Sequence, residues 1–249
     1  MRGAIAGLRL AVILTALFHS AIVSGGDLPD GQSCGPAPDP SRIVVAGGSI
    51  TEILFSLGEQ EKIVAVDRTS NYPADVSEFP VIGYVRALSA EGVLSLAPSL
   101  VLGEDDMGPI EVLTQLKSTG ISIRRIPERH TAMGIVEKVL CVAEVVGYAE
   151  SELDRLTQEY LAKVKDVGRS RDEVERGNRP KVAVIMALRD GVPFAAGSET
   201  SAAGILEMAG GDNVFAGFKG WKPVSLELMV GANPSLIVMP EARDETVWR

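Results

Sequence analysis

The feature that most constrains the fold of this chain is a regular alternation between short apolar, β-branched runs and amphipathic helical patterns. In the first half, four runs have the length of buried strands: Ile43–Ala46, Ile63–Val66, Leu100–Leu102 and Ile121–Ile126. Helical patterns follow them at Ile50–Leu57, Ala90–Leu96, Pro109–Ser118 and Ala132–Val146. Such alternation is typical of βαβ units, which build a parallel sheet covered by helices. We therefore expect an α/β fold.

A long charged segment interrupts this alternation. In residues 149–177, apolar side chains recur at helical spacing, while the other positions carry dense charges of both signs. The pattern predicts one long amphipathic helix with its polar face in water. Strand-like runs resume at Lys181–Met186, Phe194–Ala196 and Leu236–Met239. We therefore predict two Rossmann-like lobes, residues 42–147 and 179–249, joined by a spine helix over residues 148–178.

Two stretches of the chain repeat the same order of motifs. Ser89-Ala-Glu91 leads through a short helix to Pro98-Ser99-Leu100-Val101, and Ser225-Leu-Glu227 leads likewise to Pro234-Ser235-Leu236-Ile237. A match this short also arises by coincidence, but the shared order of elements favours duplication of a lobe. After the first copy come a helix, a strand and another helix, whereas only Glu241–Arg249 follows the second. We expect the second lobe to be incomplete by roughly 40 residues, as in a truncated or frameshifted product.

Residues 1–25 have the features of a secretory signal. Arg2 and Arg9 form a positive n-region, and Leu10–Val23 is an apolar stretch followed by small residues. This stretch is shorter than the ~20 residues that span a bilayer as a helix, which favours a cleaved signal over an uncleaved anchor. Residues 26–41 are rich in Pro, Gly and Asp and predict a flexible leader. We expect a soluble periplasmic protein.

Charge and cysteine content exclude several classes of function. The 249 residues include 24 Lys and Arg against 33 Asp and Glu, so a broad basic face for nucleic acid is not expected. A disulfide between Cys34 and Cys141 is one possibility, but the apolar helical pattern around Cys141 favours a buried small hydrophobe. Cys34 lacks a lipoprotein-type context, so we predict no lipid anchor. His130 alone lies outside the signal, which argues against a zinc site.

Two motifs near the first helix are local signals. Ser49 and Glu52 fit a capping box, in which the hydroxyl accepts from a backbone amide and the carboxylate reaches back. The preceding Gly47-Gly48 pair resembles a phosphate-binding loop only superficially, because it lacks both GxGxxG and a GK[ST] ending. We therefore predict a capped helix and no nucleotide site.

The connection between the second and third strands carries the chemistry. It contains Arg68, Tyr72, Tyr84 and Arg86, it is long, and it lies where α/β sheets form ligand sites. In an extended strand, Tyr84 and Arg86 would point to the same face. A guanidinium beside a phenol stabilises the phenolate, which is an axial ligand of ferric haem in some proteins. On the residues alone, a packing tyrosine and a solvated arginine remain the simpler interpretation.

Five segments of the chain resemble the periplasmic substrate-binding proteins of haem transporters. These segments are AGGSITEILFSLG, VAVDRTSNYP, GYVRALSAEGVLSLAPSLVL, GSETSAAGILEMAGG and GWKPVSLELMVGANPSLIVMPE. They run from about Arg42 to Glu241, and the Tyr-x-Arg of GYVRALSAEG is the most specific element. The other elements are shared with siderophore- and cobalamin-binding relatives. The resemblance implies two α/β lobes that clamp haem, the transported ligand, between them.

The resemblance also implies roles for individual residues. Tyr84 would be the axial ligand of the haem iron, and Arg86 would assist its phenolate. Glu91 and Glu227 would dock on basic residues of an ABC permease dimer. A carboxylate favoured by the dipole at a helix N-terminus is the alternative for both glutamates, and the two interpretations are compatible. An outer-membrane haem receptor would participate indirectly.

The second lobe offers weaker candidates. Some members of the resembled family have a histidine ligand near the strand that matches Lys181–Met186, but no histidine is present here, so stacked two-haem binding is not expected. Arg189, Trp221 and Lys222 are candidates for contacts with the haem propionates or the porphyrin face. Arg189 and Lys222 are explained equally well as solvated charges. Arg68 and Tyr72 are candidates for the pocket rim, and His130 has no assigned role.

These observations predict a periplasmic haem-binding component of an ABC importer. An enzyme is not expected, because no nucleophile–base pair or metal triad is visible. A corrinoid or ferric-siderophore carrier on the same fold is the alternative within the class of binding proteins. The Tyr84–Arg86 pair favours haem over a corrinoid, which brings its own axial ligands. A secreted α/β enzyme and a non-functional fragment remain as alternatives of other classes.

Overall fold

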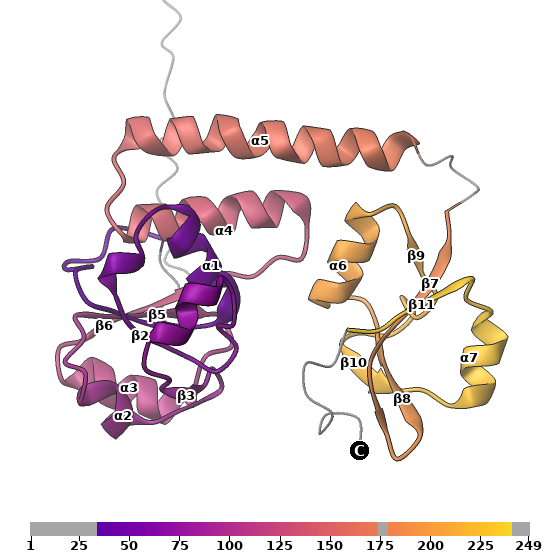
Figure 1. Cartoon of the computed structure of the whole chain (residues 1–249), viewed down its shortest axis with the longest axis horizontal. Coiled ribbons are helices and arrows are strands. Elements are labelled where there is room, and N and C mark those ends of the chain that lie inside the picture. Colours follow the sequence, from indigo (N-terminus) through magenta and orange to yellow (C-terminus); the bar gives the residue numbers. More distant parts are fainter. Residues whose placement is uncertain (1–33, 174–178, 241–249) are drawn as a thin grey trace, which may run out of the picture.

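Two lobes lie beneath a long helix in the computed structural model of the chain, which describes residues 34–173 and 179–240 (Figure 1). The expected signal, residues 1–25, lies outside the described residues. So do residues 26–33 of the expected leader and the last nine positions, 241–249. The lobes are called lobe one (residues 34–147) and lobe two (residues 179–240) below.

Lobe one contains a four-stranded parallel sheet in the order β2-β1-β5-β6. Its strands are β1 (Ile43–Ala46), β2 (Ile63–Val66), β5 (Leu100–Glu104) and β6 (Ser122–Ile126). Its helices are α1 (Gly48–Ser56), α2 (Ala90–Leu94), α3 (Ile110–Ser118) and α4 (Ala132–Val145). These elements lie close to the positions expected from the sequence. The chain progresses to one side of β1 first and later to the other, which is the arrangement that forms a ligand crevice at the strand ends.

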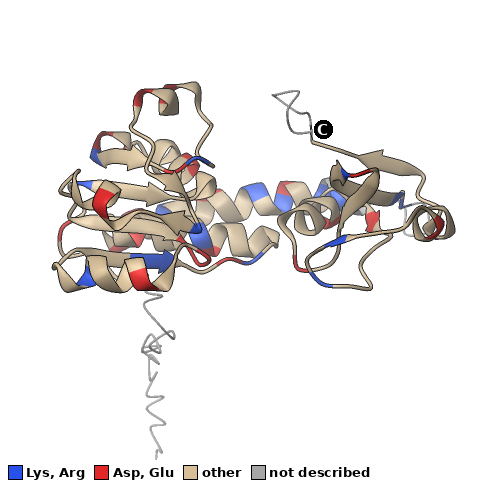
Figure 2. Cartoon of the chain, turned by 90° about the horizontal axis from the view of Figure 1, so that it is seen from below, with Lys and Arg blue, Asp and Glu red and all other residues tan. Residues whose placement is uncertain are grey.

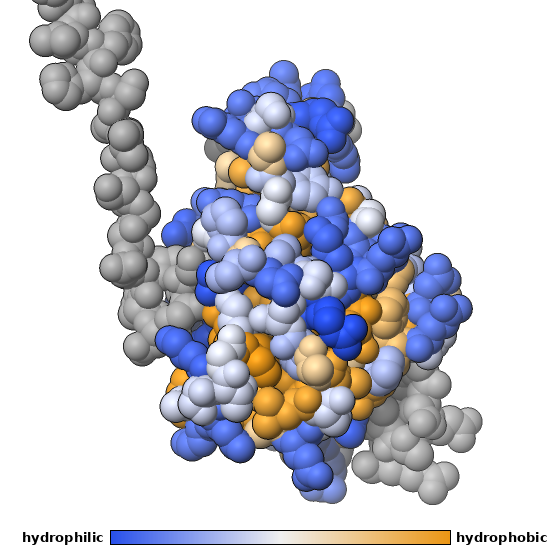
Figure 3. Space-filling view, turned by 90° about the vertical axis from the view of Figure 1, so that its left-hand side faces the viewer, coloured by the Kyte–Doolittle hydropathy of each residue, from blue (hydrophilic) through white to orange (hydrophobic). Residues whose placement is uncertain are grey.

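The alternation of side chains along β1 separates two cores. Ile43 and Val45 pack with α1 and α4, whereas Val44 and Ala46 pack with α2 and α3. All four residues are fully buried because helices cover both faces of this central strand. Figure 3 views the molecule from the lobe-one end, where hydrophilic side chains project around the rim and hydrophobic residues are visible between them.

Residues 34–41 are attached to lobe one, so the expectation of a flexible leader is wrong for this part of it. Cys34 forms a disulfide with Cys141 of α4. The backbone amide of Ala37 donates to the carbonyl of Val145 at 3.0 Å, and Ala37 is buried in the core. Cys141 is buried as expected, but as half of a disulfide rather than as a free thiol. The two cysteines are 107 residues apart, and the local helical pattern held no information about Cys34.

The long connection between β2 and β5 forms short elements that the sequence patterns did not indicate. They are the 3-10 helix η3 (Ala74–Glu78) and the strands β3 (Gly83–Tyr84) and β4 (Ala87–Leu88). Another 3-10 helix, η2 (Gln60–Lys62), lies between α1 and β2. The two strands pair antiparallel as a separate hairpin. This hairpin carries the tyrosine and the arginine singled out in the sequence.

The expected spine helix is α5 (Glu150–Glu173), which packs along α4 and also contacts helix α6 of lobe two. Leu156 is buried, while most other side chains of α5 are exposed. Figure 2 shows residues of both charge signs on the helices between the two lobes. A helix with this polar surface connects the lobes without belonging to the core of either.

Lobe two contains a smaller, mixed sheet. Its elements are β7 (Lys181–Arg189), β8 (Val192–Ala196), α6 (Ser201–Met208), β9 (Asp212–Asn213), β10 (Trp221–Pro223), α7 (Leu226–Ala232) and β11 (Leu236–Val238). Strand β7 pairs in parallel with β9 and β11 and antiparallel with β8, which pairs with β10. A small core around Ile185 and Phe215 holds this sheet to α7.

The repeat seen in the sequence is present in the backbone geometry. Ala97 and Asn233 occupy equivalent positions before β5 and β11, and both have a φ of 46°. Ser99 and Ser235 both donate their hydroxyls to carbonyls at the start of the neighbouring strand, at 3.2 and 3.0 Å. Strand β11 therefore stands beside β7 as β5 stands beside β1.

Candidate ligand-binding site

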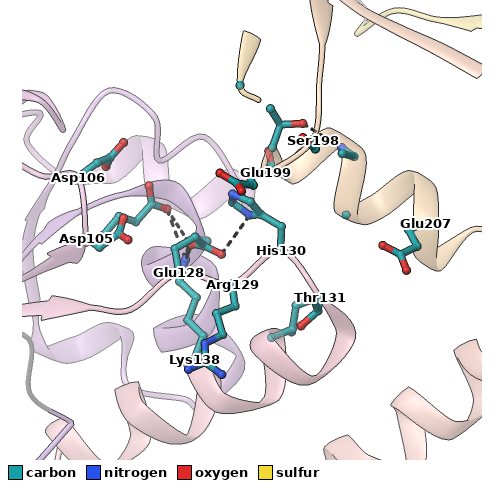
Figure 4. Close-up of a pocket in the computed structure, with 18 of the residues that line it drawn as sticks. Asp105, Asp106, Glu128, Arg129, His130, Thr131, Lys138, Ser198, Glu199 and Glu207 are labelled. Carbon is teal, nitrogen blue, oxygen red and sulfur yellow. Dashed lines mark hydrogen bonds and ion pairs between the residues drawn. The ribbon is translucent and has the colours of Figure 1, made fainter. Parts of the chain in front are cut away.

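A cleft of about 1620 Å³ lies between the lobes (Figure 4). On the lobe-one side its lining follows the ends of β1, β5 and β6, and on the lobe-two side it includes residues 198–201 before and at the start of α6. The carboxyl ends of parallel strands are the usual place for a ligand in α/β folds. The cleft exceeds the roughly 300–1,000 Å³ typical of small-molecule pockets, so it accommodates a large ligand.

Buried Lys138 organises the lobe-one wall of this cleft. Its side chain is only 6% exposed and forms an ion pair with Glu128. Its ammonium group also donates to the hydroxyl of Ser49 at 2.6 Å, and that hydroxyl donates to Glu104 at 2.5 Å. A buried ammonium is strongly unfavourable unless it is paired and hydrogen-bonded. The network therefore fixes these four side chains, which come from α1, β5, α4 and the loop after β6.

The same contacts show that the predicted capping box is wrong. Helix α1 begins at Gly48, one residue before Ser49, and no side chain caps it. Gly47 has a φ of 134°, and a Cβ there would lie 2.5 Å from the side chain of Glu104. A Cβ on Gly48 would lie 2.7 Å from the carbonyl oxygen of Thr69. The two glycines are thus required by close packing of the cleft wall, and Ser49 is free to join the Lys138 network.

The rim of the cleft on lobe one is acidic. Burial, together with the neighbouring charges of Asp106 and Glu128, raises the pKa of Asp105. Asp106 accepts from the Nε of Arg86 at 2.6 Å, and this hydrogen bond raises the pKa of Arg86. Arg86 is therefore kept charged and is held over the cleft by Asp106.

Tyr84 and Arg86 lie on the hairpin of β3 and β4. Tyr84 pairs with Ala87, so Val85 and Arg86 form the turn between the strands. The expectation of a continuous extended strand that carries both side chains on one face is wrong, because the chain reverses between them. Arg86 lines the cleft, whereas Tyr84 is 39% exposed beside it and is outside the lining defined by the described residues.

Asp67 attaches this hairpin to the end of β2. Its carboxylate is fully buried and accepts from the backbone amide of Val85 at 3.1 Å and from that of Gly47 at 2.9 Å. It also accepts from the amide and hydroxyl of Thr69 and from the hydroxyl of Ser70. A buried carboxylate with this many donors is well satisfied. Sequence reasoning gave Asp67 no role, although an acidic residue directly after a buried strand was the available signal.

The candidates on lobe two form an aromatic and cationic group near β8 and β10. Trp221 stacks on Phe194 with ring centroids 6.5 Å apart. The guanidinium carbon of Arg189 lies 4.4 Å from the centroid of the Phe194 ring. Lys222 lies 5.5 Å from the ring of Phe218. Only Trp221 of the three candidates lines the cleft, so the structure places Arg86 and Trp221 on opposite walls of it.

Arg68 and Tyr72, the predicted rim residues, lie on the β2–β5 connection. Both are exposed, and neither is among the described residues that line the cleft. The backbone amide of Arg68 donates to the carbonyl of Gly83 at 2.7 Å, so this part of the loop also supports the hairpin.

The two glutamates predicted to dock on a permease occupy matching positions. Glu91 and Glu227 lie in the first turns of α2 and α7, and both are exposed. Ser89 and Ser225 cap these helices, accepting from backbone amides at 3.3 and 3.1 Å. Hydrogen bonds from its own amide and from Ser225 lower the pKa of Glu227. Each lobe therefore presents a serine-capped, anionic helix N-terminus to solvent.

His130, which had no role in the sequence analysis, lies where the lobes meet. It follows β6, lines the cleft, and its Nδ1 is 3.6 Å from Glu128. A Cβ on Gly204 of α6 would clash with the carbonyl oxygen and side chain of His130. The glycine therefore allows α6 to approach lobe one closely, and this contact forms one end of the cleft. No pattern in the sequence joined these two positions.

Two kinds of feature are absent from the described residues. Within residues 34–173 and 179–240, no helix is long and apolar enough to cross a membrane. Over the same residues, no three His, Cys, Asp or Glu side chains come together as a metal-binding group.

The profile of the periplasmic binding protein family matches residues 43–245. The chain therefore belongs to this family, whose members are binding proteins of ABC transporters rather than enzymes. Among solved structures, it is similar to the periplasmic heme binding protein HutB of Vibrio cholerae, at 30% identity and a TM-score of 0.71 over 81% of this chain and 76% of that one. The heme-binding protein RhuT from Roseiflexus sp. RS-1 has 33% identity and a TM-score of 0.70 over 80% and 76%.

Among curated relatives, one protein is named for a different ligand, cobalamin. An uncharacterized ABC transporter substrate-binding lipoprotein, YvrC of Bacillus subtilis, is 25% identical over 202 residues, which are 80% of this chain and 63% of that protein. A cobalamin-binding protein of Halobacterium salinarum is 26% identical over 211 residues, 83% of this chain and 55% of that protein. The chain thus spans less than two thirds of the length of these relatives. The predicted two-lobe α/β fold is confirmed by these matches.

Proposed function

We propose that this protein captures ferric haem in the periplasm between its two lobes and delivers it to an ABC importer. One observation carries the proposal: the hairpin that carries Tyr84 also carries Arg86, which lines a large cleft at the strand ends. Similar structures that are named as heme-binding proteins, at 30% and 33% identity, support haem as the ligand.

Tyr84 is proposed as the axial ligand of the haem iron. Its exposed phenol lies on the hairpin that Asp67 fixes, so the oxygen is presented without a large ordering cost on binding. Arg86 is charged and lies two residues after Tyr84, and its positive charge favours the phenolate that binds ferric iron. Asp106 keeps the guanidinium at this position.

Lobe two is proposed to cover the other side of the ligand. Trp221 lines the cleft opposite Arg86 and is already stacked on Phe194, so a porphyrin face would extend an existing aromatic stack. Arg189 and Lys222 lie near this stack and are proposed to meet the propionates after a modest closure of the lobes. Arg68 and Tyr72 are proposed as rim contacts next to the hairpin.

A corrinoid is the second candidate ligand. The cobalamin-binding relatives support it, and so does the lining of the cleft, which carries more carboxylates than basic side chains. An acidic lining disfavours a strongly anionic ligand such as a ferric catecholate. The exposed tyrosine favours haem, because a corrinoid supplies its own axial ligands.

Delivery is proposed to use the two glutamates. Glu91 and Glu227 are equivalent residues of the two lobes, exposed at helix N-termini, and each is proposed to meet a basic pocket on one subunit of a permease dimer. Residues 1–25 are proposed to direct export to the periplasm, where the disulfide of Cys34 and Cys141 is stable. An outer-membrane haem receptor would supply the ligand indirectly.

A hemin titration of the mature chain, residues 26–249, tests the proposal. We expect a visible spectrum of tyrosinate-bound ferric haem in the native protein, and the loss of that spectrum in Tyr84→Phe. Tyr148→Phe is the matched control, because Tyr148 hydrogen-bonds the carbonyl of Leu57 away from the cleft. An unchanged spectrum in Tyr84→Phe overturns the ligand assignment. Binding of hydroxocobalamin in preference to hemin overturns the choice of haem.

A further inference from the structure

The two lobes touch where the loop after β6 meets the first turn of α6, at one end of the cleft (Figure 4). A Cβ on Gly204 of α6 would lie 2.2 Å from the carbonyl oxygen of His130 and 2.8 Å from its Cβ. Ordinary contacts of a Cβ are 3.4–4 Å long. Any side chain at position 204 would therefore displace either the loop of lobe one or the helix of lobe two.

The loop of lobe one is fixed by its own contacts. The carbonyl of Arg129 accepts from the amide of Thr131 at 2.9 Å, and the hydroxyl of Thr131 caps α4 by accepting from the amide of Gly134 at 3.0 Å. A Cβ on Gly134 would lie 2.2 Å from the carbonyl oxygen of Arg129, so α4 packs directly on this loop. Glu128 is paired with buried Lys138. The loop therefore cannot yield to α6 without disturbing the packing of α4.

The first turn of α6 is fixed in the same way to lobe two. The buried hydroxyl of Thr200 caps the helix by accepting from the amide of Ala203 at 3.1 Å, and it donates to the carbonyl of Gly197 at 3.0 Å. The amide of Gly204 donates to the carbonyl of Thr200 at 3.0 Å. A Cβ on Gly197 would lie 2.1 Å from the carbonyl oxygen of Phe218, so the preceding loop is closely packed as well. The start of α6 therefore moves with lobe two as one body.

Helix α5 connects the two lobes on the same side of the molecule as this contact. It packs along α4 and contacts α6, and Figure 1 shows it above both helices, whereas α2 and α7 lie farther from it. A small change where α6 meets the loop therefore becomes a larger displacement at the distant ends of the lobes. Arg86 and Trp221 line the cleft from opposite lobes, so their separation depends on this contact.

We propose that the contact between Gly204 and the main chain of His130, called the interlobe contact below, limits how closely the two lobes approach and so sets the width of the cleft for a thin, planar ligand. Both sides of the contact are fixed main chain in close packing, so a change in one lobe is transmitted to the other. The same contact sets the spacing of Glu91 and Glu227, which lie on different lobes. The choice of haem as the planar ligand rests on the proposed function, whereas the spacing of the lobes does not.

The distance between the lobes tests this proposal in the ligand-free mature chain, residues 26–249. Spin labels on Glu91→Cys and Glu227→Cys report this distance by pulsed electron paramagnetic resonance, because the two native cysteines are joined to each other and do not react. Gly204→Ala must open the interlobe contact by about 1 Å to restore an ordinary separation, so we expect a longer mean distance. Gly217→Ala is the matched control in lobe two and should leave the distance unchanged, since a Cβ there meets nothing within 4 Å.

Two results would overturn the proposal. An unchanged distance in Gly204→Ala would show that the interlobe contact does not space the lobes. Loss of the far-UV circular dichroism signal in this variant would place the constraint within lobe two, because alanine favours a helix more than glycine does and α6 should otherwise stay folded.

A hemin titration of the unlabelled variants tests the effect on the ligand site. We expect Gly204→Ala to bind hemin about tenfold more weakly than the native chain, and Gly217→Ala to bind it with native affinity. Native affinity in Gly204→Ala, together with a longer distance between the lobes, would overturn the assignment of cleft width to the interlobe contact. A native chain that binds no hemin would overturn the proposed function, but the distance measured without ligand would still decide whether the contact spaces the lobes.

Discussion

Leu100–Leu102 of lobe one and Leu236–Val238 of lobe two occupy the same place in two copies of one frame, yet the first strand is buried and the second is exposed. Both strands follow a serine-capped helix, a residue at a φ of 46° and a proline, and both pair in parallel with the first strand of their lobe. Local sequence therefore determines that a strand forms and where it pairs. Whether it is buried depends on the neighbours that complete the layer.

The comparison predicts very different costs for equivalent truncations. Leu102→Ala removes a fully buried side chain from a packed core and should lower the free energy of unfolding by about 2–5 kcal/mol. Leu236→Ala, on the exposed strand, should change it by no more than about 0.5 kcal/mol. Urea denaturation followed by circular dichroism measures both. Similar costs for the two variants would show that β11 is covered in solution.

The disulfide should stabilise lobe one alone. It closes a loop across 107 residues between Cys34 and Cys141, and such a cross-link is worth about 2–4 kcal/mol. The double variant Cys34→Ser, Cys141→Ala should therefore lower the unfolding temperature, with faster amide exchange in α4 and little change in β7. Serine at 34 and alanine at 141 match the partly exposed and buried sites. Equal effects in both lobes would mean that the lobes unfold as one unit.

The sequence predicted the elements of lobe one but not the contacts between distant residues. The strands and helices of lobe one were predicted close to their positions because periodic burial marks them. The predicted capping box is wrong because the hydroxyl of Ser49 accepts from Lys138 and donates to Glu104, two residues distant in sequence. The sequence allows the disulfide but favours a buried, unpaired Cys141, because the pairing with Cys34 depends on a tertiary contact. Patterns of local periodicity carry no information about such long-range partners.

The candidate site shows the same division between local and long-range information. The Tyr-x-Arg motif identified the hairpin, but its turn was missed, because the motif reads equally well as one extended strand. Asp67, which holds the hairpin, and His130, which meets Gly204, act through contacts between distant segments. Arg86 and Trp221 face one cleft only after both lobes have folded and α5 has joined them.

Asp67 should be more important for the hairpin than for the sheet. Asp67→Asn keeps the size of the side chain but replaces one acceptor oxygen with an NH₂ that faces backbone donors. It should therefore lower the free energy of unfolding by about 1–3 kcal/mol and weaken hemin binding, although Asp67 does not line the cleft. These hydrogen-bond partners of Asp67 lie in lobe one, so amide exchange in β7 of lobe two should not change. Hemin binding at native affinity would show that the hairpin is held by other contacts.

The smallest effect is expected from the acidic rim of lobe one. Burial and the charges of Asp106 and Glu128 raise the pKa of Asp105 above its usual value of 3.8, so the folded state disfavours its ionised form. Between the pKa of this carboxyl in the unfolded chain and its higher pKa in the folded protein, the folded state binds more protons than the unfolded state. Stability is therefore lost as the pH rises through this window. Asp105→Asn should therefore raise the unfolding temperature slightly at pH 7. The difference in unfolding temperature should vanish once the pH falls below the pKa of Asp105 in the unfolded chain, because the carboxyl is then protonated in both the folded and the unfolded state. An Asp105 effect that persists at pH 3 would indicate a lost hydrogen bond rather than a lost charge.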